Sequence, residues 1–408
     1  MSNKGKITVI VLLSVISCQL ARAEGPKEVN YFKTVKYAPR PLPKYAETKG
    51  KLPSPIYDEQ PLYVEMYWKC WEIAFKNFHE PAPKSGFVSQ FIDAAFNQNI
   101  FLWDTCFLTM FCNYAHPHVP GICSLDNFYA KQHETGEICR EINRKTGIDF
   151  GQWQNTEGKD LFSRWFKHGP VKYVGRDAPA VKPKLTHDAL NHPIFAWAEA
   201  ESIRITGDRS RLKHVYVPLV RYYRALRTYI RQGNGLYMTD WASMDNSPRN
   251  GYLKGGGTAV DTSSQMVMFG NQLAQFAELL GKKGEAAAFR KEAAQTAAKI
   301  NKLMWDPDKK FYYDLTVDGK RGPIKTIAGF WTLLAGVAEG RQVEALCAEL
   351  RDPKTFARPH LVPTLAADQP GYSKNGGYWR GAVWAPTNTM VIRGLERHGR
   401  GELAARSP

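Results

Sequence analysis

The segment 237–249, YMTDWASMDNSPR, combines two acids with an aromatic side chain, since Asp240 and Asp245 lie on either side of Trp241. A carboxylic acid beside an indole can act as a general acid and protonate the leaving oxygen of a sugar-like substrate. Pro248 disfavours the α-helical conformation at the residue before it, so the segment is predicted to be an ordered loop. The structural alternative is that Asp245 only caps a turn with its neighbours.

Helices are predicted on both sides of this acidic segment. Apolar residues recur at helical spacing before it at Leu212, Tyr216, Leu219, Tyr223, Leu226 and Ile230, and after it at Met266, Phe269, Leu273, Phe276 and Leu280. The chain contains about eleven helical segments by this criterion, including one from about Leu125 to Lys145, and it lacks sustained strand alternation. We therefore expect an all-α protein built as a closed ring of helical hairpins. An open helical solenoid is the alternative, and the absence of a fixed sequence repeat disfavours it.

The composition is compatible with a large core and a carbohydrate ligand. The 408 residues are 43% hydrophobic, which is enough for one large core or two ordinary domains. The 11 Trp, 19 Tyr and 20 Phe can build that core and can also supply faces on which sugar rings stack. The net charge is +16, but no run of Lys and Arg interleaved with aromatics occurs. We therefore expect no nucleic-acid partner.

The N-terminus has the pattern of an export signal. Lys4 and Lys6 precede an apolar run at 7–16, and the sequence Ala-Arg-Ala at 21–23 fits a small-x-small cleavage site. The apolar run is too short to be a transmembrane helix. Residues 1–23 are therefore predicted to be a signal peptide, and the mature protein is expected outside the cytoplasm.

A second interpretation of the same region is equally well supported. The sequence VISC resembles a bacterial lipobox, which would place a lipid anchor at Cys18. Under either interpretation we expect an exported bacterial protein that is periplasmic, secreted or bound to the outer membrane as a lipoprotein. Residues 24–60 are rich in Pro and Lys and are predicted to form an N-terminal arm. Residues 61–408 are expected to form one domain.

Neither the cysteines nor the acids indicate a metal site. The six cysteines after residue 23 lie within helical patterns and show no C-x-x-C spacing, so we expect most of them to be buried free thiols. Asp306, Asp308 and Asp314 lack the glycine and the terminal glutamate of a calcium-binding loop. We expect no metal ion and no cofactor.

Several motifs occur in one order along the chain. They are FLWD at 101–104, PIFAWA at 193–198, MDNSPR at 244–249, LMWD at 303–306 and GGYWRGAVWAPTN at 376–388. In this order and spacing they resemble glycoside hydrolase family 63 and its mannosylglycerate-hydrolase-like bacterial relatives, over roughly Pro61 to Gly394, with more distant similarity to trehalases. The resemblance implies a six-hairpin (α/α)6 barrel and an inverting glycosidase that acts on an α-glucoside or α-mannoside of an oligosaccharide or small glycoside.

The resemblance also assigns roles to individual residues. It implies that Asp245 is the general acid. The residues expected to bind the sugar are Trp103, Asp104, Trp241, Asn246, Trp379, Arg380 and Trp384. Arg380 can donate a planar pair of hydrogen bonds, and tryptophan faces can stack on a pyranose ring. For Trp103, Trp379 and Trp384, packing in the core is the structural alternative.

The catalytic base of that family is a glutamate that follows the GGYWRG segment in an aromatic setting. After Asp368 this sequence contains only Glu396 and Glu402 as acids, and both fit the surface of a helix better than a catalytic base. We therefore expect the last hairpin to be incomplete and the base to lie beyond Pro408. A carbohydrate-binding barrel that lacks its base is one alternative function.

Another alternative is a sugar isomerase or epimerase, because other α/α barrels perform that chemistry. Such enzymes use paired histidines as acid and base. The candidates in this sequence are His116, His118, His187 and His192, and they form no persuasive pattern.

Overall fold

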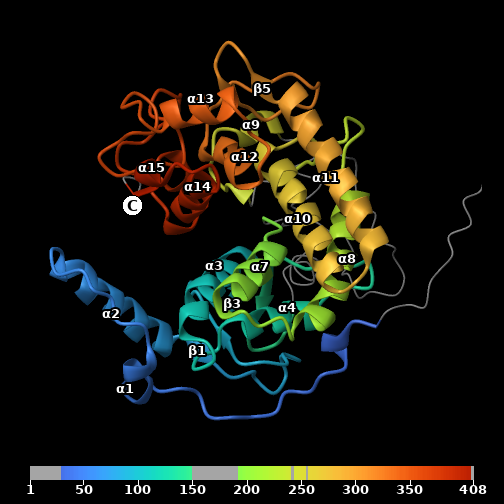
Figure 1. Cartoon of the computed structure of the whole chain (residues 1–408), viewed down its shortest axis with the longest axis vertical. Coiled ribbons are helices and arrows are strands. Elements are labelled where there is room, and N and C mark those ends of the chain that lie inside the picture. The colour runs from blue at the N-terminus through green and yellow to red at the C-terminus, as the bar shows by residue number, and fades with distance from the viewer. Residues whose placement is uncertain (1–28, 149–191, 240–242, 254–255, 406–408) are drawn as a thin grey trace, which may run out of the picture.

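The computed structural model describes residues 29–148, 192–239, 243–253 and 256–405. Helices dominate this part of the chain, and its strands occur only as three two-stranded sheets. In Figure 1 the helices surround a central region, with the N-terminal third of the chain below and the C-terminal third above. The predicted all-α class is confirmed.

The long helices are α2 (Pro61–Lys76), α3 (Leu102–Cys112), α7 (Phe195–Thr206), α8 (Leu212–Tyr229), α10 (Val260–Leu279), α11 (Lys283–Leu303) and α14 (Ala385–Arg397). The shorter helices are α1 (Tyr45–Thr48), α4 (Asp126–Ala130), α9 (Asn250–Leu253), α12 (Trp331–Leu334), α13 (Arg341–Glu349) and α15 (Gly401–Ala405). The antiparallel strand pairs are β1 (Phe78–His79) with β2 (Phe91–Ile92), β3 (Asn99–Phe101) with β4 (Glu141–Asn143), and β5 (Trp305–Asp306) with β6 (Phe311–Tyr312). The strand pairs close loops between helices and do not form a layer of their own.

The helices α8 and α10 form from the apolar stripes that the sequence shows. The stripe of α8 is buried at Leu212, Tyr216, Leu219, Tyr223 and Leu226, and that of α10 at Met266, Phe269, Leu273 and Phe276. Burial of each such side chain contributes about 1.5–3 kcal/mol, which is more than helix propensity alone supplies. The turn from α10 to α11 uses Gly281 at φ +76°, a backbone conformation that side chains with a Cβ disfavour.

Five helices form a continuous run around the centre of the molecule. α7 packs against α3 and α10, and α12 packs against α10 and α14. In Figure 1 this run forms an arc from α3 and α7, past α10, to α12 and α14. α8 and α11 pack on the outside of α10, and α15 packs on α14. This alternation of inner and outer helices is the helical-hairpin arrangement predicted from the sequence.

Most of the buried apolar residues belong to one large core, and a smaller cluster lies under α2. That cluster is centred on Trp71 and Ala74, which pack with Leu52 of the N-terminal arm. The described part of the arm, from residue 29, is also tied to α4, because Asn30 Nδ2 donates to the Tyr129 carbonyl oxygen at 2.9 Å. The arm thus contacts the helical domain at both of its ends.

The prediction of one helix from about Leu125 to Lys145 is wrong for most of that range. Within this region α4 ends at Ala130, a turn follows, and β4 pairs with β3. The turn contains Gly136 at φ +91°, where an added Cβ would lie 2.5 Å from the carbonyl oxygen of Arg221. A helix cannot pass through this residue, so the chain reverses and brings β4 beside the start of α3.

The described residues can also be compared with the predictions about membrane-spanning helices, metal sites and the burial of the cysteines. Among them, no helix is both long and apolar enough to cross a membrane, and no group of three or more His, Cys, Asp or Glu side chains could hold a metal ion. Four of the six cysteines after residue 23 are buried, namely Cys106, Cys112, Cys139 and Cys347. The signal segment and the possible lipidation site at Cys18 lie outside the described residues.

Candidate active site

Asp245 lies where two distant segments of the chain meet. Its carboxyl oxygen Oδ2 accepts hydrogen bonds from the Tyr378 hydroxyl at 3.1 Å and from the Trp379 indole N–H at 3.2 Å. Asp245 is half-buried, and Tyr378 is 45% exposed. The carboxyl group is therefore reachable from solvent while two donors fix its orientation.

Asn246 joins the same two segments through its side-chain amide. Its Oδ1 accepts a hydrogen bond from the Trp379 backbone N–H at 2.9 Å, and its Nδ2 donates to the Gly377 carbonyl oxygen at 3.1 Å. Both ends of the amide are thus engaged by protein, although the residue is exposed. Asn246 was predicted to bind substrate, and these contacts show that it holds the acid loop against the 376–381 turn.

Three aromatic rings form a wall beside Asp245. The rings of Trp379 and Trp384 stack with centroids 5.0 Å apart and an interplanar angle of 23°, and Tyr378 packs on Trp384 at 5.1 Å. Gly377, at φ +59°, makes the tight turn that brings these residues together ahead of α14. The structure therefore brings Trp379 and Trp384 together at Asp245, as the sequence predicts.

Asp104 lies near enough to Tyr378 for its charge to act on that hydroxyl. It lies in the first turn of α3, and burial raises its pKa to about 6, against the opposing effects of a backbone hydrogen bond and of the Arg140 charge. Burial and the Asp245 carboxylate raise the pKa of Tyr378 to about 12, and the Asp104 charge adds to this shift. Asp104 and Asp245 therefore both act on the Tyr378 hydroxyl from separate segments.

Glu141 is a buried acid whose pKa is affected by the Asp245 charge, and the sequence does not single it out. It lies on β4, opposite Phe101 of β3, and is only 5% exposed. Burial raises the pKa of Glu141, its ion pair with Arg140 at 3.1 Å opposes the shift, and the Asp245 charge adds to it. The sequence predicts a helix over this segment and therefore does not indicate that Glu141 lies on a strand. The Thr-Gly pair at 135–136 was the turn signal that could have revealed the strand.

Trp103 fits the core-packing alternative. It is 4% exposed, and its ring packs against His192 at 4.3 Å, Phe107 at 4.9 Å and Trp331 at 6.1 Å between centroids. His192 is itself buried, with its ring nitrogens near Gln265 Oε1 and the Ser243 carbonyl oxygen, both at 3.1 Å. Trp103 therefore supports the start of α3 from within the core.

The remaining predicted residues are not brought to Asp245 by any contact in the described chain. Arg380 is exposed, and its Nε donates a hydrogen bond to the Gly371 carbonyl oxygen at 2.8 Å. Its guanidinium is thus directed toward the loop that precedes the 376–381 turn. Trp241, together with Asp240, lies outside the described residues.

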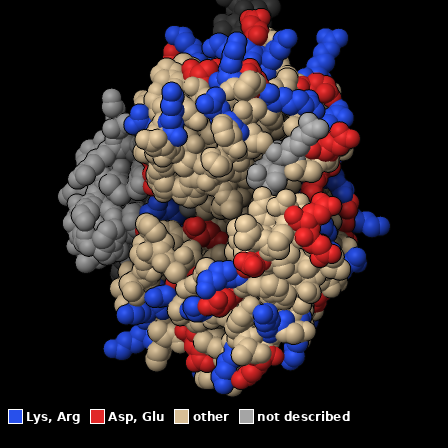
Figure 2. Space-filling model, turned by 90° about the vertical axis from the view of Figure 1, so that its left-hand side faces the viewer, with Lys and Arg blue, Asp and Glu red and all other residues tan. Residues whose placement is uncertain are grey.

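Figure 2 shows the face of the molecule that lies on the left in Figure 1, where α2 projects below and α15 lies above. This face is hollowed about midway between its top and bottom, and acidic side chains lie within the hollow. Carboxyl groups with aromatic rings are a suitable lining for a neutral ligand rich in hydroxyl groups, because carboxylates accept hydrogen bonds from hydroxyls.

Comparison with known proteins shows the family. Residues 154–407 match the model of the mannosylglycerate hydrolase MGH1-like glycoside hydrolase domain. An uncharacterised protein of Borreliella burgdorferi is 28% identical over 303 residues, which cover 73% of this chain and 56% of that protein. A mannosylglycerate hydrolase of Thermus thermophilus is 37% identical over 105 residues, or 25% of each protein. The sequence matches thus span about half the length of the Borreliella relative and a quarter of the Thermus enzyme.

Solved structures show the same architecture. A family 63 mannosylglycerate hydrolase from Thermus thermophilus, crystallised with glucose, aligns with a TM-score of 0.60 at 20% identity, over 83% of this chain and 88% of that one. A neutral trehalase from Saccharomyces cerevisiae aligns with a TM-score of 0.51 at 13% identity, over 87% and 77% of the two chains. At these identities the likeness shows the fold, and it confirms the predicted (α/α)6 barrel class. With the match of the family model to more than half of its length, the chain belongs to the mannosylglycerate hydrolase MGH1-like glycoside hydrolases of family 63.

Proposed function

We propose that the protein hydrolyses an α-glucoside or α-mannoside, part of an oligosaccharide or a small glycoside, with inversion, and that Asp245 is its general acid. The observation that carries this proposal is the position of the Asp245 carboxyl between the Tyr378 hydroxyl and the Trp379 indole. Relatives named as mannosylglycerate hydrolases, and a related structure with bound glucose, support a pyranoside as the substrate.

The arrangement suits proton donation to a leaving oxygen. Both protein donors bind Oδ2 of Asp245, which leaves Oδ1 to carry the proton. After the proton has been transferred, the same two donors stabilise the carboxylate that remains, because hydrogen bonds to a charged group are stronger than those to a neutral one. The wall formed by Trp379 and Trp384 can stack on the apolar face of the sugar ring, and Asp104 can accept hydrogen bonds from sugar hydroxyls.

Inversion requires a second carboxyl that activates water on the opposite face of the sugar, about 6.5–9.5 Å from the acid. The described acids that follow Asp368 do not fit this role. Glu396 pairs with Arg393 at 2.6 Å on the surface of α14, and Glu402 is exposed. Asp104 is assigned to sugar hydroxyls and Glu141 pairs with Arg140 at 3.1 Å, so we propose that the base lies outside the described residues.

Product stereochemistry tests this proposal. The protein is incubated with 4-nitrophenyl α-mannoside and α-glucoside, and the anomeric protons of the released sugar are followed by NMR during the first minutes. Inversion releases the β-hemiacetal first. Initial release of the α-hemiacetal would contradict the inverting mechanism, and hydrolysis that survives Asp245→Asn unchanged on a substrate with a poor leaving group would remove Asp245 as the acid.

A catalytically impaired carbohydrate-binding barrel is the second candidate, because neither Glu396 nor Glu402 is placed as a base. It predicts that mannose or glucose quenches tryptophan fluorescence through Trp379 and Trp384 while no glycoside is turned over. The isomerase alternative has less support, because His192 is buried between Gln265 and Ser243 and is held there by hydrogen bonds.

We also propose that the protein is exported by its N-terminal segment, either as a cleaved periplasmic or secreted protein or as a lipoprotein anchored at Cys18. Support comes from the positively charged start, the apolar run at 7–16 and the two overlapping cleavage patterns. Mass spectrometry of the mature protein from the native host distinguishes an N-terminus at Glu24 from an acylated Cys18. An unprocessed N-terminus would contradict both forms of export.

A further inference from the structure

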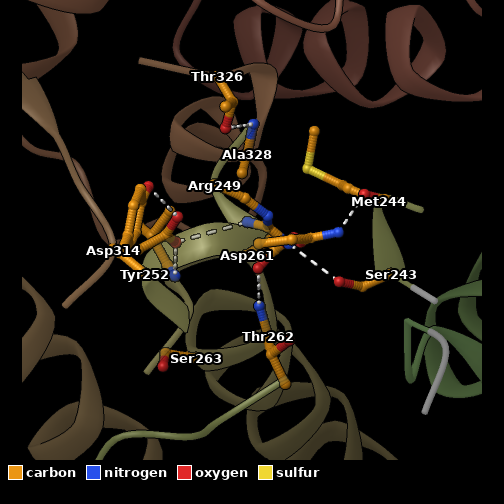
Figure 3. Close-up of polar contacts among 12 residues, drawn as sticks. Ser243, Met244, Arg249, Tyr252, Asp261, Thr262, Ser263, Asp314, Thr326 and Ala328 are labelled. Carbon is orange, nitrogen blue, oxygen red and sulfur yellow. Dashed lines mark hydrogen bonds and ion pairs between the residues drawn. The ribbon is translucent and has the colours of Figure 1, made fainter. Parts of the chain in front are cut away.

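Arg249, the last residue of the MDNSPR motif, is fully buried and surrounded by polar groups. Its guanidinium forms ion pairs with Asp261 Oδ2 at 2.7 Å and with Asp314 Oδ1 at 3.4 Å, and it donates a hydrogen bond to Ser243 Oγ at 3.0 Å. All three charged side chains are at most 2% exposed. Figure 3 shows Arg249 reaching between Asp314 on one side and Asp261 and Ser243 on the other.

The two carboxyl groups are themselves held by the backbone of α10 and by Tyr252. Asp314 Oδ1 accepts from the Val260 backbone N–H at 2.8 Å, and its Oδ2 accepts from the Tyr252 hydroxyl at 3.1 Å. Asp261 lies in the first turn of α10 and accepts from the Thr262 backbone N–H at 2.8 Å. Arg249 is therefore attached to a rigid helix end and does not lie in a flexible loop.

The charges in this cluster depend on one another. Burial alone would raise the pKa of Asp261, but the Arg249 guanidinium holds this pKa below its ordinary value. Burial raises the pKa of Asp314, and Arg249 only partly opposes that effect. Removal of one partner from such a buried pair leaves an uncompensated charge, which is costly. The conformation around Arg249 is thus strongly specified.

Arg249 is connected to Asp245 through the segment between them. Its hydrogen bond to Ser243 joins the two ends of the segment 243–249, and Asp245 lies in the middle. Asn250, the next residue, donates through Nδ2 to the carbonyl oxygens of Met244 at 3.0 Å and of Asp245 at 2.9 Å. Displacement of Arg249 must therefore move the backbone that carries the acid.

We infer that Arg249 is a positioning residue for Asp245, an assignment that rests on the proposed function. Its buried ion pairs hold the segment 243–250 against the start of α10, so that the Asp245 carboxyl meets the Tyr378 hydroxyl and the Trp379 indole. Arg249 touches neither the carboxyl of Asp245 nor the aromatic wall in any described contact, so its effect on catalysis is indirect.

The indole resonance of Trp379 gives a readout that does not require catalysis. The full chain is labelled with ¹⁵N-tryptophan, the Trp379 signal is assigned with Trp379→Phe, and its dependence on the acid is calibrated with Asp245→Ala, which removes the acceptor. We expect Arg249→Lys to move the Trp379 resonance toward its position in Asp245→Ala, because the indole then loses its partner. A Trp379 resonance that stays in place in folded Arg249→Lys overturns the inference.

The matched control is Arg211→Lys. Arg211 also lies between two acids, Asp126 and Glu199, both at 2.9 Å, but it joins α4, α7 and the start of α8. We expect this variant to lose thermal stability and to keep the Trp379 resonance. An equal displacement in the control would show a general loss of packing and would also overturn the inference. If Arg249→Lys does not fold, Ser243→Ala decides by the same criterion, since it removes the hydrogen bond from Arg249 that joins the two ends of the segment.

Kinetics separates this inference from the proposed function. On glycosides with poor leaving groups we expect Arg249→Lys to lower kcat by about 10–100-fold, because a displacement of about 1 Å at a reacting group can cost that much. Activated aryl glycosides, which need less protonation, should be affected much less, and Arg211→Lys should show no such difference. Absence of hydrolysis by the unaltered protein would contradict the proposed function, while the Trp379 resonance would still decide the role of Arg249.

Discussion

The indole N–H of Trp379 donates a hydrogen bond to Asp245 Oδ2 at 3.2 Å across a sequence separation of 134 residues. Asn246 reinforces the contact by bonding the backbone of Trp379. The proposed general acid is therefore oriented by a segment that lies far from it in the sequence. A change that separates the two segments should impair proton donation to the substrate more than it destabilises the fold, because the contact lies at the surface of the core.

Replacement of the acid gives the most direct prediction. Asp245→Asn preserves the shape of the side chain but cannot deliver a proton, so we expect kcat on substrates with poor leaving groups to fall by about 10²–10⁴-fold. The measurement is steady-state hydrolysis of alkyl and aryl α-glycosides, with circular dichroism to show that the fold is kept. The exposed Asp308 supplies the control, since Asp308→Asn should behave like the unaltered protein. Equal losses on good and poor leaving groups would argue against proton donation.

Tyr378→Phe tests the second donor to the acid. It removes the 3.1 Å hydrogen bond to Asp245 Oδ2 but keeps the ring that packs on Trp384. A hydrogen bond to a charged group contributes about 1.5–3 kcal/mol, so we expect kcat to fall by about 10–100-fold while KM changes little. Sugar affinity, measured by calorimetry on the same variant, should be preserved. A rise in KM without a change in kcat would instead assign Tyr378 to substrate binding.

The raised pKa of Asp104 makes stability depend on pH. The pKa of Asp104 is about 6 in the folded protein and near 4 in the unfolded chain. Its contribution to the free energy of unfolding is therefore fully present below about pH 4 and is lost as the pH rises to about 6. Asp104→Asn removes this dependence. We therefore expect the variant to gain about 1–3 kcal/mol of unfolding free energy relative to the unaltered protein between pH 4 and pH 7.

Denaturant unfolding at several pH values checks this difference, with Asp308→Asn as the surface control. If the stability of Asp104→Asn relative to the unaltered protein does not change with pH, Asp104 is not held in a desolvated setting. The sugar-binding role assigned to its carboxylate also predicts weaker affinity below pH 6, where the group is protonated.

Gly136 should tolerate no side chain. Its φ of +91° costs an alanine about 1–2 kcal/mol, and the added Cβ would meet the Arg221 carbonyl oxygen at 2.5 Å. Gly207 offers a matched control, because its φ is +72° and an added Cβ would have nothing within 4 Å. We expect Gly136→Ala to be less stable than Gly207→Ala by about 1–3 kcal/mol, the usual cost of overpacking. Equal losses of thermal stability in the two variants would mean that the turn before β4 relaxes freely.

Part of the site could be predicted because it lies in short motifs with their own local signals. Asp245 stands in a loop that Pro248 and the flanking helices define, and Trp379 and Trp384 stand in the GGYWRGAVW segment, where glycines force a turn. The sequence and its resemblance to family 63 single out these residues, and the structure brings them together. The roles proposed for them still await the experiments above.

Other parts could not be predicted, because they depend on contacts between distant segments. Glu141 lies beside the start of α3 only because β4 pairs with β3, a pairing of two three-residue strands that leaves no periodic signal. Trp103 lies beside Asp104 in sequence, yet its ring turns into the core against His192 and Trp331. Neighbours along a helix point in different directions, so adjacency to a polar residue did not show that Trp103 faces the ligand.

The sequence by itself determined the helical class of the protein and the loop that carries Asp245, because apolar periodicity and turn-forming residues act over a few neighbouring positions. Only the tertiary structure decided what surrounds that acid. The hydrogen bonds from Tyr378 and Trp379, and the ion pairs of Arg249 with Asp261 and Asp314, join residues that lie far apart along the chain. Such contacts form only when burial of the helix faces brings those segments together. The local sequence around any one of these residues therefore does not predict them.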